Sequence, residues 1–375
     1  MLRKNLWLGL ALLCGVAAAA SQNPGAVFLM IWPAARPTAM AGAFTAIADD
    51  ASAIYYNPGG LAFLDRTRAT LMHSNWLPGL YPGMYYEYGA VTHQFPARGT
   101  GGFDVTYLTT GETEVYNERG EYLGRYTTFD VSPGVAYGYP VLPNLGVGVG
   151  AKFIYSFLVP EWVWGLMPEL LISNGGTGIT WALDAGVLYK PWHSLNLGMS
   201  VANVGPDISY TDTGQGDPLP RMLRLGLAYY PVASEHFRVG IVPELNKSLV
   251  GMFYDPDGTK SFSDKLATEW HDTWKTLALE GTFRAEQLAL AARVAYFEDL
   301  DGARGGITVE REGSTPEHVS LWDALTRRGL GKFKSVGLCF GAGIEYARFG
   351  FDLSIDQMIY DFSTSNYKFS LSYQF

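Results

Sequence analysis

A long succession of segments with period-two alternation of apolar and polar residues constrains the fold of this chain most strongly. From Arg66 to the end we count fourteen such runs, and helical periodicity is almost absent. The alternation predicts β-strands, and runs of about 11 to 15 residues are long enough to cross a bilayer at a tilt. The expected strands are 67–78, 84–95, 100–111, 126–140, 144–158, 177–190, 194–205, 219–232, 235–247, 272–284, 286–298, 332–347, 349–360 and 365–375.

Connections between these runs alternate in length. Every second connection is a tight turn, such as Leu142-Pro143 and Trp192-His193, whereas the others are longer and polar, above all 159–176, 248–271 and 299–331. Outer-membrane barrels have short periplasmic turns and long extracellular loops. A soluble β-sandwich, the alternative, is not expected to have connections that alternate in length in this way. The sequence therefore predicts an all-β, 14-stranded antiparallel transmembrane barrel over residues 66–375.

The alternation also predicts which residues meet lipid. In the last run Tyr367, Phe369, Leu371, Tyr373 and Phe375 share one face, which we expect to meet outer-membrane lipid. A Lys or Arg on the lipid face at mid-bilayer costs about 2 to 4 kcal/mol, so charged residues belong inside. Those that the alternation places inside are Asp184, Arg224, Arg238, Glu244, Glu280, Arg293, Glu345, Asp352 and Asp356.

A charged N-terminus followed by an apolar run indicates export. Arg3 and Lys4 precede the run Leu6–Ala20, which ends in small residues. This pattern predicts a cleaved signal peptide over residues 1–20. Lipid attachment at Cys14, the alternative, is disfavoured because the preceding Leu13 is bulky. An exported barrel belongs in the outer membrane of a Gram-negative-type bacterium.

Residues 21–65 form a different domain in which small residues dominate. The segment contains Gly42, Asp49 and Asp50, and the run Asn57-Pro58-Gly59-Gly60 predicts a tight turn at its end. Because Ala and Gly allow close backbone approach, we expect a compact plug or hatch inside the lumen. A periplasmic tail is the alternative.

The run A-M-A-G-A-F-T-A-I-A-D-D-A-S-A-I-Y-Y-N-P-G-G-L-A (residues 39–62) resembles the N-terminal hatch of FadL-like transporters and of the PorV/PorQ family. Those families usually have Asn-Pro-Ala where this chain has Asn57-Pro58-Gly59, a mild departure. Residues 200–226, with S-V-A-N-V-G-P-D-I-S-Y followed by D-P-L-P and L-R-L-G, resemble the PorV/PorQ family more selectively, as does E-L-N-K-S-L-V (residues 244–250). The similarity runs from about residue 30 to the end, but loops 248–271 and 299–331 match no pattern.

This resemblance implies a component of the type IX protein secretion system that receives cargo carrying C-terminal sorting domains. It would pass this cargo from the secretion translocon to the surface-attachment proteins. The loop 159–176 is unusually apolar and is the candidate cargo-contact loop, through Trp162, Trp164, Leu166, Met167 and Leu170. A FadL-like transporter of hydrophobic small molecules is the alternative function. The closing Tyr373-Gln374-Phe375 resembles the signal that the barrel assembly machinery recognises.

Motifs for catalysis and metal binding are missing from the sequence. The six histidines lie far apart, and no G-x-S-x-G occurs. We therefore expect no metal, no cofactor and no enzyme activity; an enzyme acting on lipopolysaccharide is a third, weaker alternative. A net charge of −9 leaves no basic face for nucleic acid.

Overall fold

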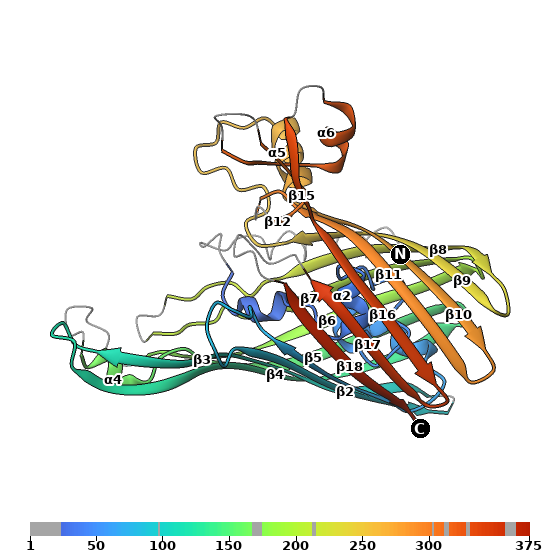
Figure 1. Cartoon of the computed structure of the whole chain (residues 1–375), viewed down its shortest axis with the longest axis horizontal. Coiled ribbons are helices and arrows are strands. Elements are labelled where there is room, and N and C mark those ends of the chain that lie inside the picture. Colours follow the sequence, from blue (N-terminus) through green and yellow to red (C-terminus); the bar gives the residue numbers. More distant parts are fainter. Residues whose placement is uncertain are drawn as a thin grey trace, which may run out of the picture.

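The computed structural model shows a closed barrel of fourteen antiparallel strands (Figure 1). The structure describes residues 24–96, 98–166, 175–211, 215–301, 304–310, 315–327, 331–356 and 365–375; the predicted signal peptide, residues 1–20, lies outside them. The barrel strands are β1 (Arg68–Asn75), β2 (Tyr85–Phe95), β3 (Gly99–Tyr116), β4 (Tyr122–Leu142), β5 (Leu145–Phe157), β6 (Thr177–Trp192), β7 (Leu195–Val204), β8 (Met222–Ala233), β9 (Phe237–Ser248), β10 (Trp274–Ala285), β11 (Leu288–Asp299), β16 (Leu338–Tyr346), β17 (Phe349–Asp356) and β18 (Asn366–Gln374).

Sequential strands pair with each other all the way around the ring. The first strand closes it by pairing with the last, from Arg68↔Gln374 to Asn75↔Tyr367. Beyond β11 the ring continues with β16, from Leu288↔Tyr346 to Tyr296↔Leu338. The predicted class, a 14-stranded antiparallel barrel, is confirmed.

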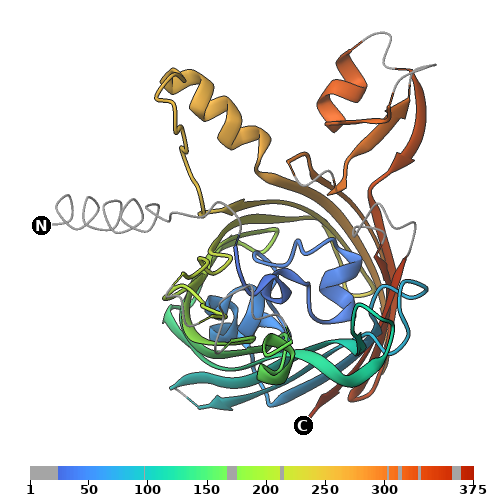
Figure 2. The ribbon, with the colours of Figure 1, turned by 90° about the vertical axis from the view of Figure 1, so that its left-hand side faces the viewer.

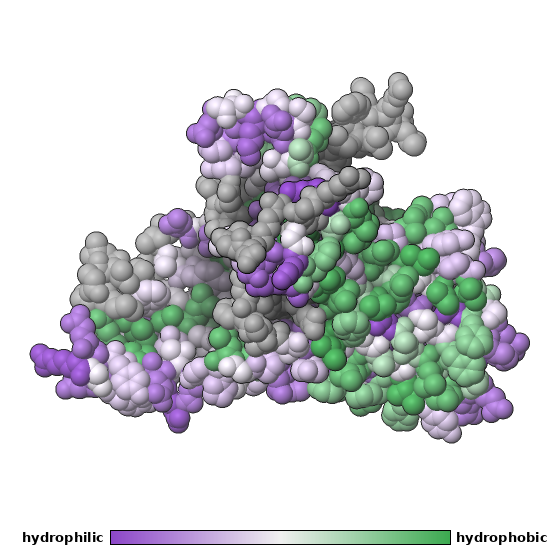
Figure 3. Space-filling model, turned by 45° about the horizontal axis from the view of Figure 1, so that its top comes forward, coloured by the Kyte–Doolittle hydropathy of each residue, from purple (hydrophilic) through white to green (hydrophobic). Residues whose placement is uncertain are grey.

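Side chains alternate between the two faces of the wall as the sequence predicts. In β6 the side chains of Ile179 and Trp181 are 58% and 51% exposed on the outer face, whereas Ala182 and Leu188 are fully buried on the inner face. Hydrophobic residues gather over the half of the barrel next to the short turns, with hydrophilic residues at the turn tips (Figure 3). This outer surface suits contact with lipid.

Two of the long connections contain secondary structure that the sequence analysis did not predict. The connection after β9 forms helix α5 (Phe262–His271), whose first turn has a capping box between Ser261 and Asp264. The connection after β11 contains β12 (Arg304–Gly305), helix α6 (Leu321–Thr326) and a small sheet of β13 (Ile307–Glu310), β14 (Glu317–Val319) and β15 (Lys332–Val336). We expected residues 332–347 to form one barrel strand; the chain instead divides at Gly337 into β15, which pairs with β13, and the barrel strand β16. Both helices project away from the barrel ring (Figure 2). No helix among the described residues is long and apolar enough to cross a membrane.

The hairpin of β3 and β4 is also longer than expected and extends beyond the rest of the barrel (Figure 1). We expected strands at 100–111 and 126–140. The additional part carries polar residues such as Glu112, which pairs with Arg125 at 2.8 Å. Such residues interrupt the alternation of apolar and polar residues, and the predicted strands therefore stopped short of the observed hairpin. Helix α4 (Glu161–Trp164) follows the next strand.

The described part of the N-terminal segment, residues 24–64, lies inside the ring (Figure 2). It consists of four short elements, η1 (Val27–Met30), α2 (Ala35–Ala39), α3 (Ala53–Tyr56) and η2 (Pro58–Phe63). The two largest hydrophobic clusters each combine residues of this segment with inward-facing residues of the wall. The core of the protein is therefore the interface between the segment and the barrel.

Candidate functional site: the luminal segment and the barrel wall

Small residues bring the backbone of the segment directly against the backbone of the wall. A Cβ atom added to Gly59 would lie 2.8 Å from the Cα of Val187 in β6, closer than real Cβ atoms approach. On the wall itself, a Cβ added to Gly148 in β5 would overlap Pro58. Glycine at both positions is what allows the segment to contact the strands without a gap.

The predicted hatch residues determine the path of the segment. Gly42 has a φ of +78° and lies beneath the ring of Trp32. The side-chain amide of Asn57 donates to the carbonyls of Thr45 at 2.7 Å and of Val187 at 2.9 Å. Its oxygen accepts from the amide of Gly59 at 3.0 Å. Pro58 is the first residue of η2, and Gly60 approaches the carbonyl of Ala48 too closely for a side chain. Asn57 therefore ties the end of the segment to β6.

A network of charged residues ties the other side of the segment to β10, β11 and β17. The guanidinium of Arg36 binds both carboxylate oxygens of Glu280, at 3.0 and 3.1 Å, and Asp49 at 2.6 Å. Arg293 binds the same Glu280 at 2.7 Å and Asp352 at 2.6 Å. Bidentate pairs of this kind combine strength with a defined geometry. Arg36 was not among the residues predicted from the sequence. Its position as a single arginine in a run of small residues is a signal that could have identified it.

The pKa values of the two neighbouring acids of the segment are shifted in opposite directions. Burial by itself would raise the pKa of Asp49, but the attraction of Arg36 outweighs it, so the pKa lies below its usual value. For Asp50 burial dominates and the pKa is raised, although Arg36 and hydrogen bonds from Ser52 oppose the shift. Asp49 is therefore a charged partner of Arg36 at neutral pH.

Further wall residues hold the segment by hydrogen bonds to its backbone. The fully buried Lys368 of β18 donates to the carbonyl of Trp32 at 2.6 Å and to the hydroxyl of Thr38 at 3.1 Å. Glu244 of β9 accepts from the amide of Thr45 at 2.9 Å. The segment is thus bound on several sides of the ring.

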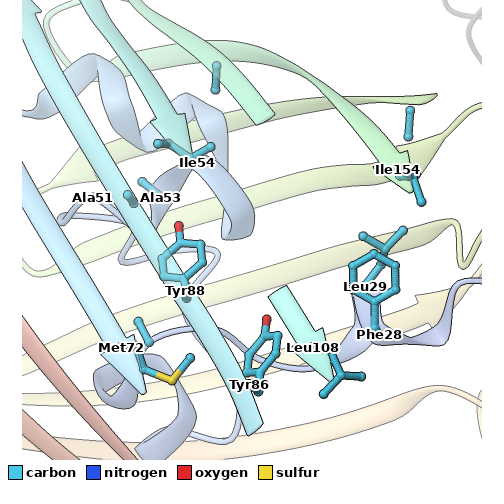
Figure 4. Packing of buried hydrophobic residues seen from close by; sticks show 14 of the residues in the cluster. Phe28, Leu29, Ala51, Ala53, Ile54, Met72, Tyr86, Tyr88, Leu108 and Ile154 are labelled. Atoms are coloured by element: carbon cyan, nitrogen blue, oxygen red, sulfur yellow. The ribbon is translucent and has the colours of Figure 1, made fainter. Parts of the chain in front are cut away.

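Apolar side chains fill much of the space between the segment and strands β1 to β6. Tyr86 and Tyr88 of β2 point toward the segment, as do Met72 of β1, Leu108 of β3 and Ile154 of β5, and they meet Phe28, Leu29 and Ile54 (Figure 4). Water-filled membrane barrels have a polar interior. In this part of the interior the side chains that face the segment are mostly apolar instead.

Strand pairing in the wall is interrupted beside this apolar region. Between β4 and β5 the pairs Val131↔Tyr155 and Gly134↔Lys152 are formed, but no pairs form between them. Pro133 lies in this gap, and proline has no N–H with which to continue a ladder. The wall is therefore held by fewer hydrogen bonds here.

A second irregularity lies nearby, between β6 and β7. The register shifts between Leu183 and Ala185, and Asn203 has a φ of +63°. The Asn203 amide donates to Asp184 at 2.8 Å, while Lys152 pairs with Asp184 at 2.8 Å and donates to the Asn203 side chain at 2.9 Å. These bonds stabilise a β-bulge. Sequence analysis placed Asp184 inside the barrel but did not predict the bulge.

An apolar groove of about 720 Å³ lies on the outer face of this part of the wall. A very small cavity of about 10 Å³ inside the barrel, next to Leu29 and Ile54, shares the wall residues Val135, Ala151 and Asp184 with it. The groove and the cavity therefore lie on opposite faces of the same irregular stretch of wall. The other residues lining the groove are Ala136, Tyr137, Val149, Gly150, Leu183, Ala185, Val201 and Val204.

The remaining predicted site residues lie elsewhere. Trp162 and Leu166 are 42% and 45% exposed at the end of the molecule with the long loops, and Trp162 contacts Tyr126 edge-to-face. Trp164 is half-buried, and Met167 and Leu170 lie outside the described residues. In the last strand the expected outer face is formed by Tyr367, Phe369, Leu371, Tyr373 and Phe375, all exposed except the half-buried Tyr373.

No protein-family model and no curated protein matches the chain in sequence. Similar solved structures include the toluene transporter TodX of Pseudomonas putida, at 13% identity and a TM-score of 0.49, over 90% of this chain and 96% of that one. The toluene transporter TbuX of Ralstonia pickettii is similar at 12% identity and a TM-score of 0.49, over 92% and 98% of the chains. A FadL homologue of Pseudomonas aeruginosa is similar at 13% identity and a TM-score of 0.45, over 92% and 99%.

The barrel assignment rests on the strand pairing of this chain itself. None of the three structures is named as a PorV/PorQ protein, so that resemblance stays a prediction.

Proposed function

We propose that this protein is an outer-membrane transporter of hydrophobic small molecules, the function first considered as the alternative. The observation that carries the proposal is the apolar groove on the outer face of one weakened stretch of wall, whose inner face meets the luminal segment. The inner cavity is next to Leu29 and Ile54, and the groove of about 720 Å³ faces outward beside Ala151 and Ala185. In this proposal, a hydrophobic molecule that reaches the inner face of this stretch needs to cross only the wall itself to reach lipid.

The luminal segment explains why such a route would be lateral. Residues 24–64 lie across the lumen and are tied to the wall by Arg36, Asn57 and Lys368. In this proposal they act as the plug that was expected over residues 21–65, closing the direct path along the barrel axis. Small side chains and missing hydrogen bonds make the wall beside Pro133 and Asn203 the easier exit.

The orientation follows from the connections. Short turns of outer-membrane barrels face the periplasm and long loops face the medium. The start of β1 at Arg68 and the chain end at Phe375 lie at the end of the barrel with the short turns. The extended β3–β4 hairpin, α5 and α6 are then extracellular, and hydrophobic compounds enter from that side.

Uptake measurements test the proposal. Bacterial cells that make the protein should accumulate a neutral aromatic hydrocarbon such as toluene faster than cells that lack it. Uptake of a charged solute of similar size should be the same in both, because the groove at the proposed exit is lined almost entirely by apolar residues. Equal hydrocarbon uptake with and without the protein, at matched amounts of folded barrel in the membrane, would contradict the proposal.

A second candidate, the type IX secretion component, is favoured by a different observation. The projecting elements expose large apolar side chains: Phe262 of α5 is 71% exposed, and Trp322 and Leu325 of α6 are each 74% exposed. Exposed aromatic residues are typical of protein-binding surfaces. Deleting the gene and analysing cell-surface proteins tests this candidate, which requires that cargo with sorting domains disappears from the surface.

A further inference from the structure

The end of the lumen next to the short turns contains a polar cavity separate from the apolar groove described above. Its volume is about 410 Å³, which is within the range of ligand-binding pockets. Seven basic and five acidic residues line it, although the whole chain has a net charge of −9. Positive charge is therefore concentrated at this site.

Most of the charges in this cavity neutralise each other. Asp49, Glu280 and Asp352 bind Arg36 or Arg293, and Asp65 binds Arg68 at 3.1 Å. Glu345 is the one lining acid for which no ion pair is found among the described residues. The other four acids bind only Arg36, Arg66, Arg68 and Arg293, so three of the seven basic residues that line the cavity are left without a carboxylate partner in the part of the chain that the structure describes.

Three basic side chains, Lys190, Arg238 and Arg284, have no carboxylate within ion-pair distance among the described residues. All three line the cavity. Arg238 pairs with Thr282 in the β9–β10 register, so Arg284 lies two positions further along the same inward face. Cross-strand residues in this diagonal relation are close enough for long side chains to share a partner.

Aromatic rings hold two of these cations in place. The ammonium of Lys190 lies 4.0 Å from the ring centroid of Phe63, and the guanidinium of Arg238 lies 3.8 Å from that of Tyr230. Cation–π contacts stabilise a charge without neutralising it. Lys190 and Arg238 also line a second cavity of about 630 Å³ at the short turns, so both cavities adjoin the same pair of cations.

We infer that Lys190, Arg238 and Arg284 form a binding site for a small anion with two or more negative charges, such as a tricarboxylate or a phosphate. Guanidinium groups bind carboxylate and phosphate oxygens through paired hydrogen bonds. Thr282 and Gln374 also line the cavity and can donate further hydrogen bonds to oxygen. The site faces the periplasm in the orientation given above and does not depend on hydrocarbon transport.

Binding of citrate and of inorganic phosphate to the purified full-length protein in detergent tests this inference. Titration calorimetry at low ionic strength should detect binding of at least one of them, and added salt should weaken it. Arg238→Gln and Arg284→Gln should each lower the affinity about tenfold or more, because each removes a charge-assisted hydrogen bond. Lys190→Met should act in the same direction while keeping the contact with Phe63.

Arg348→Gln is the matched control, because Arg348 is an exposed arginine in a short turn that lies outside the cavity. It should bind like the wild type. Retained heat-modifiable mobility on gels shows that each variant is folded. The phosphate of a copurified phospholipid is another candidate source of the anion. If it occupies the site, the amount of phosphorus that copurifies with the protein should be lower for Arg238→Gln than for the wild type, which supports the inference. No binding by the folded wild type, or equal affinity in the wild type and all three variants, would overturn the inference.

Discussion

Replacing Arg36 by glutamine should loosen the luminal segment without unfolding the barrel. Arg36 makes a bidentate pair with Glu280 and a third bond to Asp49, and its side chain is 17% exposed. Removing one member of a buried ion pair costs about 3 to 5 kcal/mol. Here Glu280 keeps its bond to Arg293 at 2.7 Å, and the Asp49 side chain is 35% exposed and partly screened. We therefore expect a loss of about 2 to 3 kcal/mol.

This loss corresponds to a roughly 30- to 150-fold increase in the population with the segment released. Hydrogen exchange followed by mass spectrometry measures it directly, as faster exchange of the amides in residues 35–56 while the barrel strands stay protected. Arg66→Gln is the control, because the Arg66 side chain is 50% exposed and its ion pair with Asp65, at 3.5 Å, is long and exposed. Unchanged exchange of the segment in folded Arg36→Gln would refute the reasoning that this network holds it.

Three further perturbations test other contacts of the site. Gly59→Ala places a methyl group against the Val187 backbone and should destabilise the docked segment by about 1 to 3 kcal/mol, seen as faster segment exchange, whereas Gly281→Ala has open space and should not. Asn203→Ala removes the side-chain bonds that support the bulge and should lower the temperature at which the folded gel band disappears; an unchanged temperature would mean that the bulge is stable without them. Because Arg36 lowers the pKa of Asp49, that pair stabilises the segment above the usual pKa of about 4 and stops doing so as the pH falls below it. Asp49→Asn should therefore abolish part of the acid-induced loosening of the segment, and an identical pH profile would exclude this role.

The barrel could be predicted from the sequence because its signal is local. Each strand can be predicted from its own alternation of apolar and polar residues, as at Ile179 and Trp181 in β6. The lengths of the connections predict which end of the barrel has the short turns and which has the long loops. The helices of the long loops and the strands β12 to β14 were not predicted because they are short and lack strand alternation, whereas β15 was predicted as a strand but assigned to the barrel. The apolar spacing of Phe262, Leu266 and Trp270 in α5 is visible in the sequence, but it covers only about two turns.

The contacts of the site could not be predicted because they join residues far apart in the chain. Arg36 and Glu280 are 244 positions apart, and alternation assigned Glu280 to the inner face without indicating its partner. Likewise, the bulge at Asn203 depends on Asp184 and Lys152, which come from two other strands. The Asn57-Pro58-Gly59-Gly60 turn was visible because turn chemistry is local, whereas its hydrogen bond to Val187 was not.

Blocking the outer groove tests the central claim most directly. Ala151 lines the groove, and Ala342 in β16 is an outward-facing alanine on another part of the wall. The measurement is the initial rate of toluene uptake by cells that make equal amounts of folded wild type, Ala151→Trp or Ala342→Trp. We predict that Ala151→Trp reduces the rate to that of cells without the protein and that Ala342→Trp leaves it unchanged. Full uptake through Ala151→Trp would contradict a lateral route through this wall.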